Sequence, residues 1–179
     1  LPGFHRADGY AKSVPLCAMS LLARDPAWIP RLITLLNHPA YVVRVYAAKA
    51  LGELRAEGAV EPIAKVLRDG YPFEDAIEHD SGKHGPDISR FVRWKGYLAM
   101  SLGNIGSERA REVLEQLVVD SQAPRDIRVG AAIGLGTVAD RRSRGALTEA
   151  SRQDIVRAVR QTARHALHEI DVAQQGSQP

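Results

Sequence analysis

The side chains best suited to chemistry gather in one short segment, residues 70–87, which reads GYPFEDAIEHDSGKHGPD. His79, Asp80 and His84 are of types that ligate metal ions, but their spacing matches no established metal-binding signature. The simpler interpretation is a surface loop, and long loops often carry binding residues. The segment therefore supplies candidate partner-binding residues and no predicted metal site. These candidates are Tyr71, Phe73, Glu74, Asp75, His79 and His84.

A second group of chemistry-bearing residues is the stretch 141–164, where seven arginines accompany two acidic residues. A solvated face is the simpler interpretation, and the functional alternative is a site for an anionic partner. An acidic protein surface fits better than nucleic acid, because residues 98–179 contain no aromatic side chain for base stacking. The candidates for polyanion binding are Arg141, Arg142, Arg144, Arg157, Arg160 and Arg164.

The sequence contains no motif for nucleotide binding or hydrolysis. It has no glycine-rich phosphate loop, no Gly-x-Ser-x-Gly and no His-Glu-x-x-His. Its single cysteine, Cys17, can form neither an internal disulfide nor a cysteine-based zinc site. His165 and His168 lie beside Glu169 on a predicted helix, and we expect them to be structural or exposed. The sequence therefore predicts no enzyme activity and no cofactor.

Composition and charge restrict the class of protein. The 179 residues are 45% hydrophobic and 25% charged, with a net charge of +3. These values are typical of one globular domain or a short repeat array, and they exclude a disordered chain. No apolar run approaches the ~18 residues that cross a bilayer. Because the chain starts at Leu1 rather than Met, we expect a processed product or part of a longer solenoid. The cytoplasm is the default expectation for its compartment.

An internal repeat determines where these residues lie. An apolar-Arg step, two alanines and an Ala/Gly-Leu-Gly-x-apolar ending occupy 43–54 and return at 127–138. Related copies occupy 92–105 and 159–170, the last with histidine in the glycine position. The glycine positions of the last three copies are 33 and 32 residues apart. The period is therefore near 32 residues, and the longer first gap contains the segment 70–87.

Each copy is followed by a second apolar stretch with i, i+3, i+4, i+7 spacing, so each unit is predicted to be a pair of α-helices. No stretch shows the alternation typical of β-strands. The alanines would let neighbouring helices approach closely, and the repeated arginine would pair with an acidic group or helix end of the adjacent unit. Ser107 and Asp154 are predicted N-caps. The predicted helices are 14–23, 27–37, 40–54, 59–69, 88–104, 108–119, 125–138, 143–152 and 154–170.

This pattern resembles HEAT repeats, specifically the bacterial HEAT-like type named after phycobilisome bilin lyases. The resemblance implies a right-handed α-α superhelix of about four and a half helix pairs over 14–170, between an extension, 1–13, and a polar tail, 171–179. Proteins of this kind are mostly interaction scaffolds, while minority subgroups act on bilins, hydroxylate a lysine derivative with iron or excise alkylated DNA bases. The single His168-Glu169 step does not fit the iron subgroup, and Trp94 lacks the partner aspartate of the base-excision subgroup.

We therefore expect a non-enzymatic scaffold that binds another protein through its concave face, the 70–87 segment, or both. The family geometry implies that the second helices of the pairs line that face. Two alternatives remain: binding of nucleic acid or another polyanion through 141–164, and activity as a bilin lyase or pigment chaperone. The candidate protein-binding residues are Arg31, Thr34, Glu61, Lys65, Arg68, Arg111, Glu112 and Glu115.

Overall fold

The computed structural model describes residues 25–69 and 88–176, with side chains from Trp94 onward in the second range. Within these ranges the chain forms eight α-helices, three short 3₁₀ helices and no β-strand, which confirms the predicted all-α class. The predicted helix 14–23 and the segment 70–87 lie outside the described residues. The elements are η1 (Pro26–Trp28), α2 (Ile29–Leu35), α3 (Tyr41–Glu53), η2 (Glu57–Ala59), α4 (Val60–Arg68), α6 (Ile88–Ile105), α7 (Glu108–Val119), α8 (Arg125–Val138), η3 (Arg141–Ser143), α9 (Arg144–Gln153) and α10 (Arg157–Gln175).

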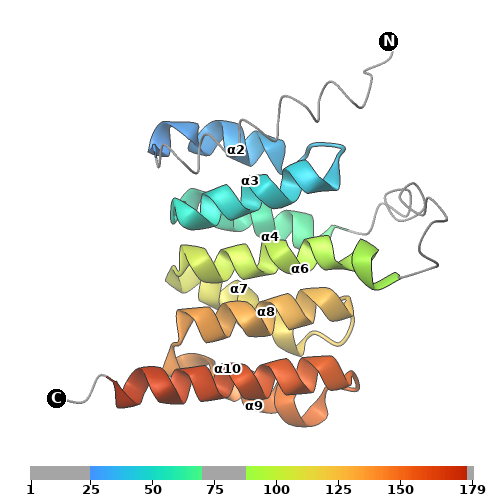
Figure 1. The fold of residues 1–179 in the computed structure, drawn as a ribbon, viewed down its shortest axis with the longest axis vertical. Helices are drawn as coiled ribbons and strands as arrows, with labels where there is room; N and C mark the ends of the chain where they lie inside the picture. Colours follow the sequence, from blue (N-terminus) through green and yellow to red (C-terminus); the bar gives the residue numbers. More distant parts are fainter. Residues whose placement is uncertain (1–24, 70–87, 177–179) are drawn as a thin grey trace.

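The helices form a two-layered stack. Figure 1 shows α3, α6, α8 and α10 one above another, with α4, α7 and α9 behind them. We call the four in front the first-helix layer, because each is the first helix of its repeat. The helices α2, α4, α7 and α9 are the second helices, and we call them the second-helix layer. Consecutive helices thus alternate between layers, as in an α-solenoid.

Glycines, rather than the alanines that the repeat pattern predicted, make the closest contacts between α6 and α8 in the first-helix layer. Ala131 is fully buried in α8. A Cβ added at Gly103 of α6 would lie 2.5 Å from the Cα of Gly134 on α8, and one added at Gly130 would clash with the carbonyl of Gly96. The backbones of α6 and α8 therefore touch, and only glycine permits this approach.

The helix ends agree with the sequence in part. Ser107 caps α7, because its Oγ accepts a backbone N–H of the first turn at 3.2 Å. Asp154 does not cap α10, whose N-cap is Val156. The carboxylate of Asp154 instead accepts the N–H of Val156 at 2.7 Å, one step before the helix. Helix α10 continues to Gln175 and so extends into the segment predicted as a polar tail.

The repeated arginine connects adjacent repeats at two of its three described copies. Arg128 lies 2.8 Å from Asp154 in the next repeat, with side chains only 6% and 7% exposed. This confirms the predicted pairing with an acidic group. Arg44 contacts the next repeat differently, since its guanidinium lies 4.2 Å from the ring centroid of Trp94. Arg160 donates to carbonyls in the loop before its own helix.

Candidate functional site

Two of the predicted protein-binding residues on α4 are exposed and engaged in local contacts. The ammonium of Lys65 lies 2.8 Å from the carboxylate of Asp69, one turn later. Arg68 donates a hydrogen bond of 3.2 Å to the amide oxygen of Gln116 on α7. Exposed contacts of this kind contribute little to stability, so a partner can displace them at small cost.

A bridge between α4 and α7 involves two more predicted residues. Arg109 lies 2.6 Å from Glu61 on α4 and 3.0 Å from Glu112 on its own helix. Hydrogen bonds to Glu61 and then to Glu112 raise the pKa of Arg109. On α2, Arg31 and Thr34 are exposed, and the Thr34 hydroxyl donates to a carbonyl of its own helix. Glu61 thus connects α4 to α7, while Glu112 pairs with Arg109 within α7.

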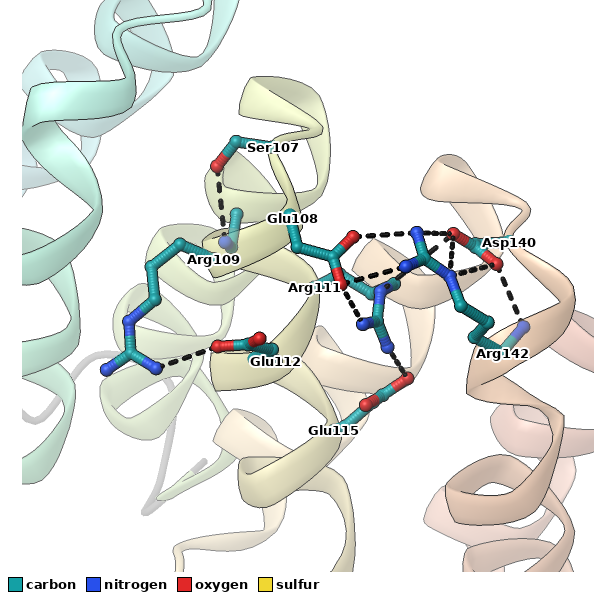
Figure 2. Close-up of polar contacts among 9 residues, drawn as sticks. Ser107, Glu108, Arg109, Arg111, Glu112, Glu115, Asp140 and Arg142 are labelled. Carbon is teal, nitrogen blue, oxygen red and sulfur yellow. Dashed lines mark hydrogen bonds and ion pairs between the residues drawn. The ribbon is translucent and has the colours of Figure 1, made fainter.

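The remaining predicted residues of α7 belong to a network that joins α7 to η3 (Figure 2). The side chain of Arg111 is 8% exposed and pairs with Glu108 and Glu115. Arg142 of η3 pairs with Glu108 and Asp140, each at 2.6 Å. Figure 2 shows Glu108 between the two guanidinium groups. Arg111 was predicted to bind a protein and Arg142 to bind a polyanion. The structure instead connects the two arginines through the carboxylate of Glu108.

The network shifts the pKa values of its members. The hydrogen bond from Arg111 is the main cause that lowers the pKa of Glu108, and a second one from Arg142 acts in the same direction. Hydrogen bonds from the side chain and backbone N–H of Arg142 lower the pKa of Asp140. The same contacts raise the pKa values of both arginines. All four groups stay charged at neutral pH, and the network clamps α7 to η3.

The arginine-rich stretch 141–164 is partly neutralised by carboxylates from outside it. Arg144 pairs with Asp171 on α10, as Arg142 pairs with acidic residues of the network above. Arg160 and Arg164 donate to backbone carbonyls. The polyanion candidates that are exposed and have no polar partner among the described residues are Arg141 and Arg157.

The sequence predicts a partner-binding loop at 70–87. Its candidates lie outside the described residues: Tyr71, Phe73, Glu74, Asp75, His79 and His84. Within the described ranges, no three metal-ligating side chains gather in one place. No helix in those ranges is long and apolar enough to cross a membrane.

The exposed surface of the first-helix layer is hollowed at each helix boundary. Grooves of about 610, 590 and 560 Å³ lie between α3 and α6, between α6 and α8, and between α8 and α10. Neighbouring grooves share lining residues. Tyr97 and Met100 belong to the first and second grooves, and Ile133 belongs to the second and third. We call this continuous surface the trough.

Large apolar side chains are exposed along the trough. Tyr46, Tyr97 and Ile133 are 40%, 50% and 36% exposed. They come from three successive first helices and line adjoining grooves. A row of exposed apolar groups on a folded surface is typical of a binding site. The trough is therefore the candidate functional site.

One position of the repeat pattern identifies residues of the trough, although the sequence analysis, which selected mainly charged residues, did not use it. Lys49, Met100, Ile133 and His165 each stand three residues before the glycine position of their repeat. All four line the trough. The arginine, alanine and Leu-Gly positions of a first helix are used for packing, so the positions between them face outward. Those outward positions differ from copy to copy and form the candidate site.

Comparisons with known families agree with this architecture. A family model for HEAT repeats matches residues 91–168. A model for the PBS lyase HEAT-like repeat matches residues 43–69. No curated protein matches the chain.

Proposed function

Because this chain is a HEAT-like repeat protein, we propose that it is a non-enzymatic scaffold that binds another protein through the trough. HEAT repeats generally mediate contacts between proteins. The observation that carries the proposal is the row of exposed apolar side chains, Tyr46, Tyr97 and Ile133, across α3, α6 and α8. Burial of these groups against a partner is favourable, because it removes apolar surface from water.

The spacing of the two layers supports the choice of this face. First helices approach to backbone contact, as at Gly103 and Gly134. Second helices are connected through long paired side chains, such as Arg109 and Glu61. A two-layered stack curves toward the layer with the closer spacing, so we assign the concave surface to the first-helix layer. This assignment differs from the sequence-based expectation that the second helices line the concave face.

The contacts of Arg111 in the second-helix layer favour a structural role for this residue rather than a role in partner binding. Arg111 is nearly buried, and its carboxylate partners come from α7 itself and from the turn before η3. Lys65 and Arg68 are exposed, so a large partner that wraps around the stack can reach them. We treat them as secondary contacts and the trough as the primary one.

The two alternative functions have less support. The match to the PBS lyase HEAT-like repeat spans α3 and α4, where Ala47 and Ile63 are packing residues, so it bears on the repeat rather than on a reaction. Binding of a polyanion through 141–164 is weakened because Arg142 and Arg144 already pair with carboxylates. A scaffold requires no reactive group and no excess of free cations.

Affinity capture with the purified chain tests the proposal. We would compare the wild type, a Tyr97→Ser/Ile133→Ser variant and a matched control, Ile155→Ser, whose side chain is 91% exposed outside the trough. We expect a stoichiometric protein partner with the wild type and the control, stable to nuclease, and its loss with the trough variant. Circular dichroism establishes that each variant is folded.

Three results would contradict the proposal. Retention of the partner by the trough variant would place binding elsewhere. Loss of all partners on nuclease treatment or moderate salt would favour polyanion binding, because phosphate contacts release counterions. A coloured eluate would favour chemistry on an open-chain tetrapyrrole.

A further inference from the structure

Aromatic side chains are concentrated in the α3–α6 groove of the trough. The part of the chain with described side chains has five aromatic residues, and four of them line this groove: Tyr41, Tyr46, Trp94 and Tyr97. Trp94 is 4% exposed and forms the floor, with the guanidinium of Arg44 against its ring. Tyr46 and Tyr97 are about half exposed and present ring surface to a ligand.

The groove also contains polar groups that can bind an extended backbone. Asn104 is exposed on α6, and its amide makes no hydrogen bond with a described residue. Aromatic walls with a few donors between them are the arrangement that recognises polyproline II segments. In such a segment, proline rings pack on aromatic faces. Its carbonyls have no internal hydrogen bond and so accept from side-chain donors.

The charge of the groove is positive. Lys49 is exposed at its edge, and none of the lining residues is aspartate or glutamate. Lys49 forms no ion pair within the described ranges. Arg44 adds positive charge next to the floor, 4.2 Å from the Trp94 ring centroid. The buried ammonium of Lys95, 5.6 Å from that centroid, instead donates to the backbone carbonyl of Asp69. A carboxylate on a ligand would therefore find a favourable potential and an available ammonium group.

Single-stranded nucleic acid also stacks on aromatic side chains, but this groove suits it less well. Nucleic acid requires a row of cations that follows the phosphates. The groove offers one exposed cation, Lys49. The polyanion candidates without a described partner, Arg141 and Arg157, lie on η3 and at the start of α10 and do not line the groove.

We propose that the α3–α6 groove binds an extended, proline-containing acidic segment of the partner protein. Its prolines pack against Tyr46 and Tyr97, and a carboxylate of the segment pairs with Lys49. This inference rests on the proposed scaffold function and specifies the chemistry that the trough recognises at its α3 end.

Selection from a display library of random dodecapeptides on the immobilised full chain tests this inference. We expect enrichment of peptides that combine proline with aspartate or glutamate. An enriched peptide is then synthesised with a fluorophore and titrated by anisotropy. Tyr97→Ala is expected to weaken its binding at least about tenfold, and Lys49→Glu to weaken it and to select basic peptides instead. A matched control, Val172→Ala, changes a 48% exposed side chain outside the trough and leaves affinity unchanged.

Every other result overturns the inference. These results are an absence of enrichment, enrichment of basic or purely aliphatic peptides, and binding that Tyr97→Ala leaves intact. Salt-sensitive binding of oligothymidine that depends on Tyr97 would assign the groove to nucleic acid. The capture experiment separates the two proposals. A partner that requires Tyr97 and Ile133, combined with no enriched peptide, refutes the peptide chemistry and leaves the scaffold function standing.

Discussion

Replacement of Arg128 by methionine tests whether buried ion pairs hold adjacent repeats together. Its Nε lies 2.8 Å from Asp154, and the two side chains are 6% and 7% exposed. The same guanidinium donates to the carbonyls of Ser121 and Ala123 in the loop before α8. Methionine fills a similar volume but leaves the Asp154 carboxylate buried without its cation.

The magnitude follows from this burial. Removal of one partner of a buried ion pair costs about 3–5 kcal/mol of unfolding free energy. A matched control is Arg144→Met, because Arg144 also pairs with a carboxylate of another helix, Asp171, but both side chains are about half exposed. The control is expected to cost about 0–1 kcal/mol. Adding Asp154→Leu to Arg128→Met removes the unpaired charge and is expected to recover part of the loss.

Urea denaturation followed by circular dichroism at 222 nm measures these differences. With an m value of about 2–3 kcal/mol/M, a loss of about 3–5 kcal/mol in Arg128→Met lowers the midpoint by roughly 1–2.5 M. Equal m values for wild type and variant are needed to compare the free energies, because repeat arrays can unfold in parts. A midpoint for Arg128→Met that equals that of Arg144→Met would refute the reasoning.

Three further predictions concern packing, charge and capping. Gly103→Ala places a Cβ against Gly134 and is expected to cost about 1–3 kcal/mol by denaturation, whereas Gly145→Ala, with nothing within 4 Å, is expected to be harmless. Because its pKa is lowered in the folded state, Glu108 contributes stability above its ordinary pKa of 4.5, and this contribution is lost as the pH falls through the lowered value. The difference in melting temperature between wild type and Glu108→Gln should therefore shrink between pH 7 and pH 3, and a constant difference would contradict the role of the network. Ser107→Ala removes the cap of α7 and is expected to cost about 1 kcal/mol, while Ser107→Gly should cost less; equal losses would argue against the cap.

The fold was predictable because packing residues repeat. The pattern at 127–138 indicated which small residues and which arginine of one helix are used for packing. The predicted helix 125–138 has the same bounds as α8. The predicted helix 108–119 likewise has the bounds of α7. The predicted start of the last helix at Asp154 was wrong, because α10 begins at Arg157. Asp154 is a good capping residue by type, but its carboxylate pairs with Arg128, which is distant in sequence. Local sequence preference does not reveal such a partner.

The candidate site was harder to predict, since its residues are those that do not repeat. Charged residues on the second helices were chosen by type, yet Arg111 is buried in contacts with Glu108 and Glu115. Arg142 pairs with Glu108, 34 positions away, and spacing along one helix gives no sign of that contact. Tyr46 and Tyr97 occupy equivalent outward positions, but their shared face is evident only once α3 and α6 are stacked.

Photo-crosslinking tests the central claim most directly, namely that the first-helix layer is the binding face. Benzoylphenylalanine would replace Tyr97 in the trough or, in a separate protein, Lys65 on α4, which has a 74% exposed side chain on the other layer. Each protein would be irradiated in lysate of the source organism, and the crosslinked partners identified by mass spectrometry. The account predicts a defined protein adduct from position 97 and little or none from position 65. An adduct from position 65 alone would contradict it and assign binding to the second-helix layer.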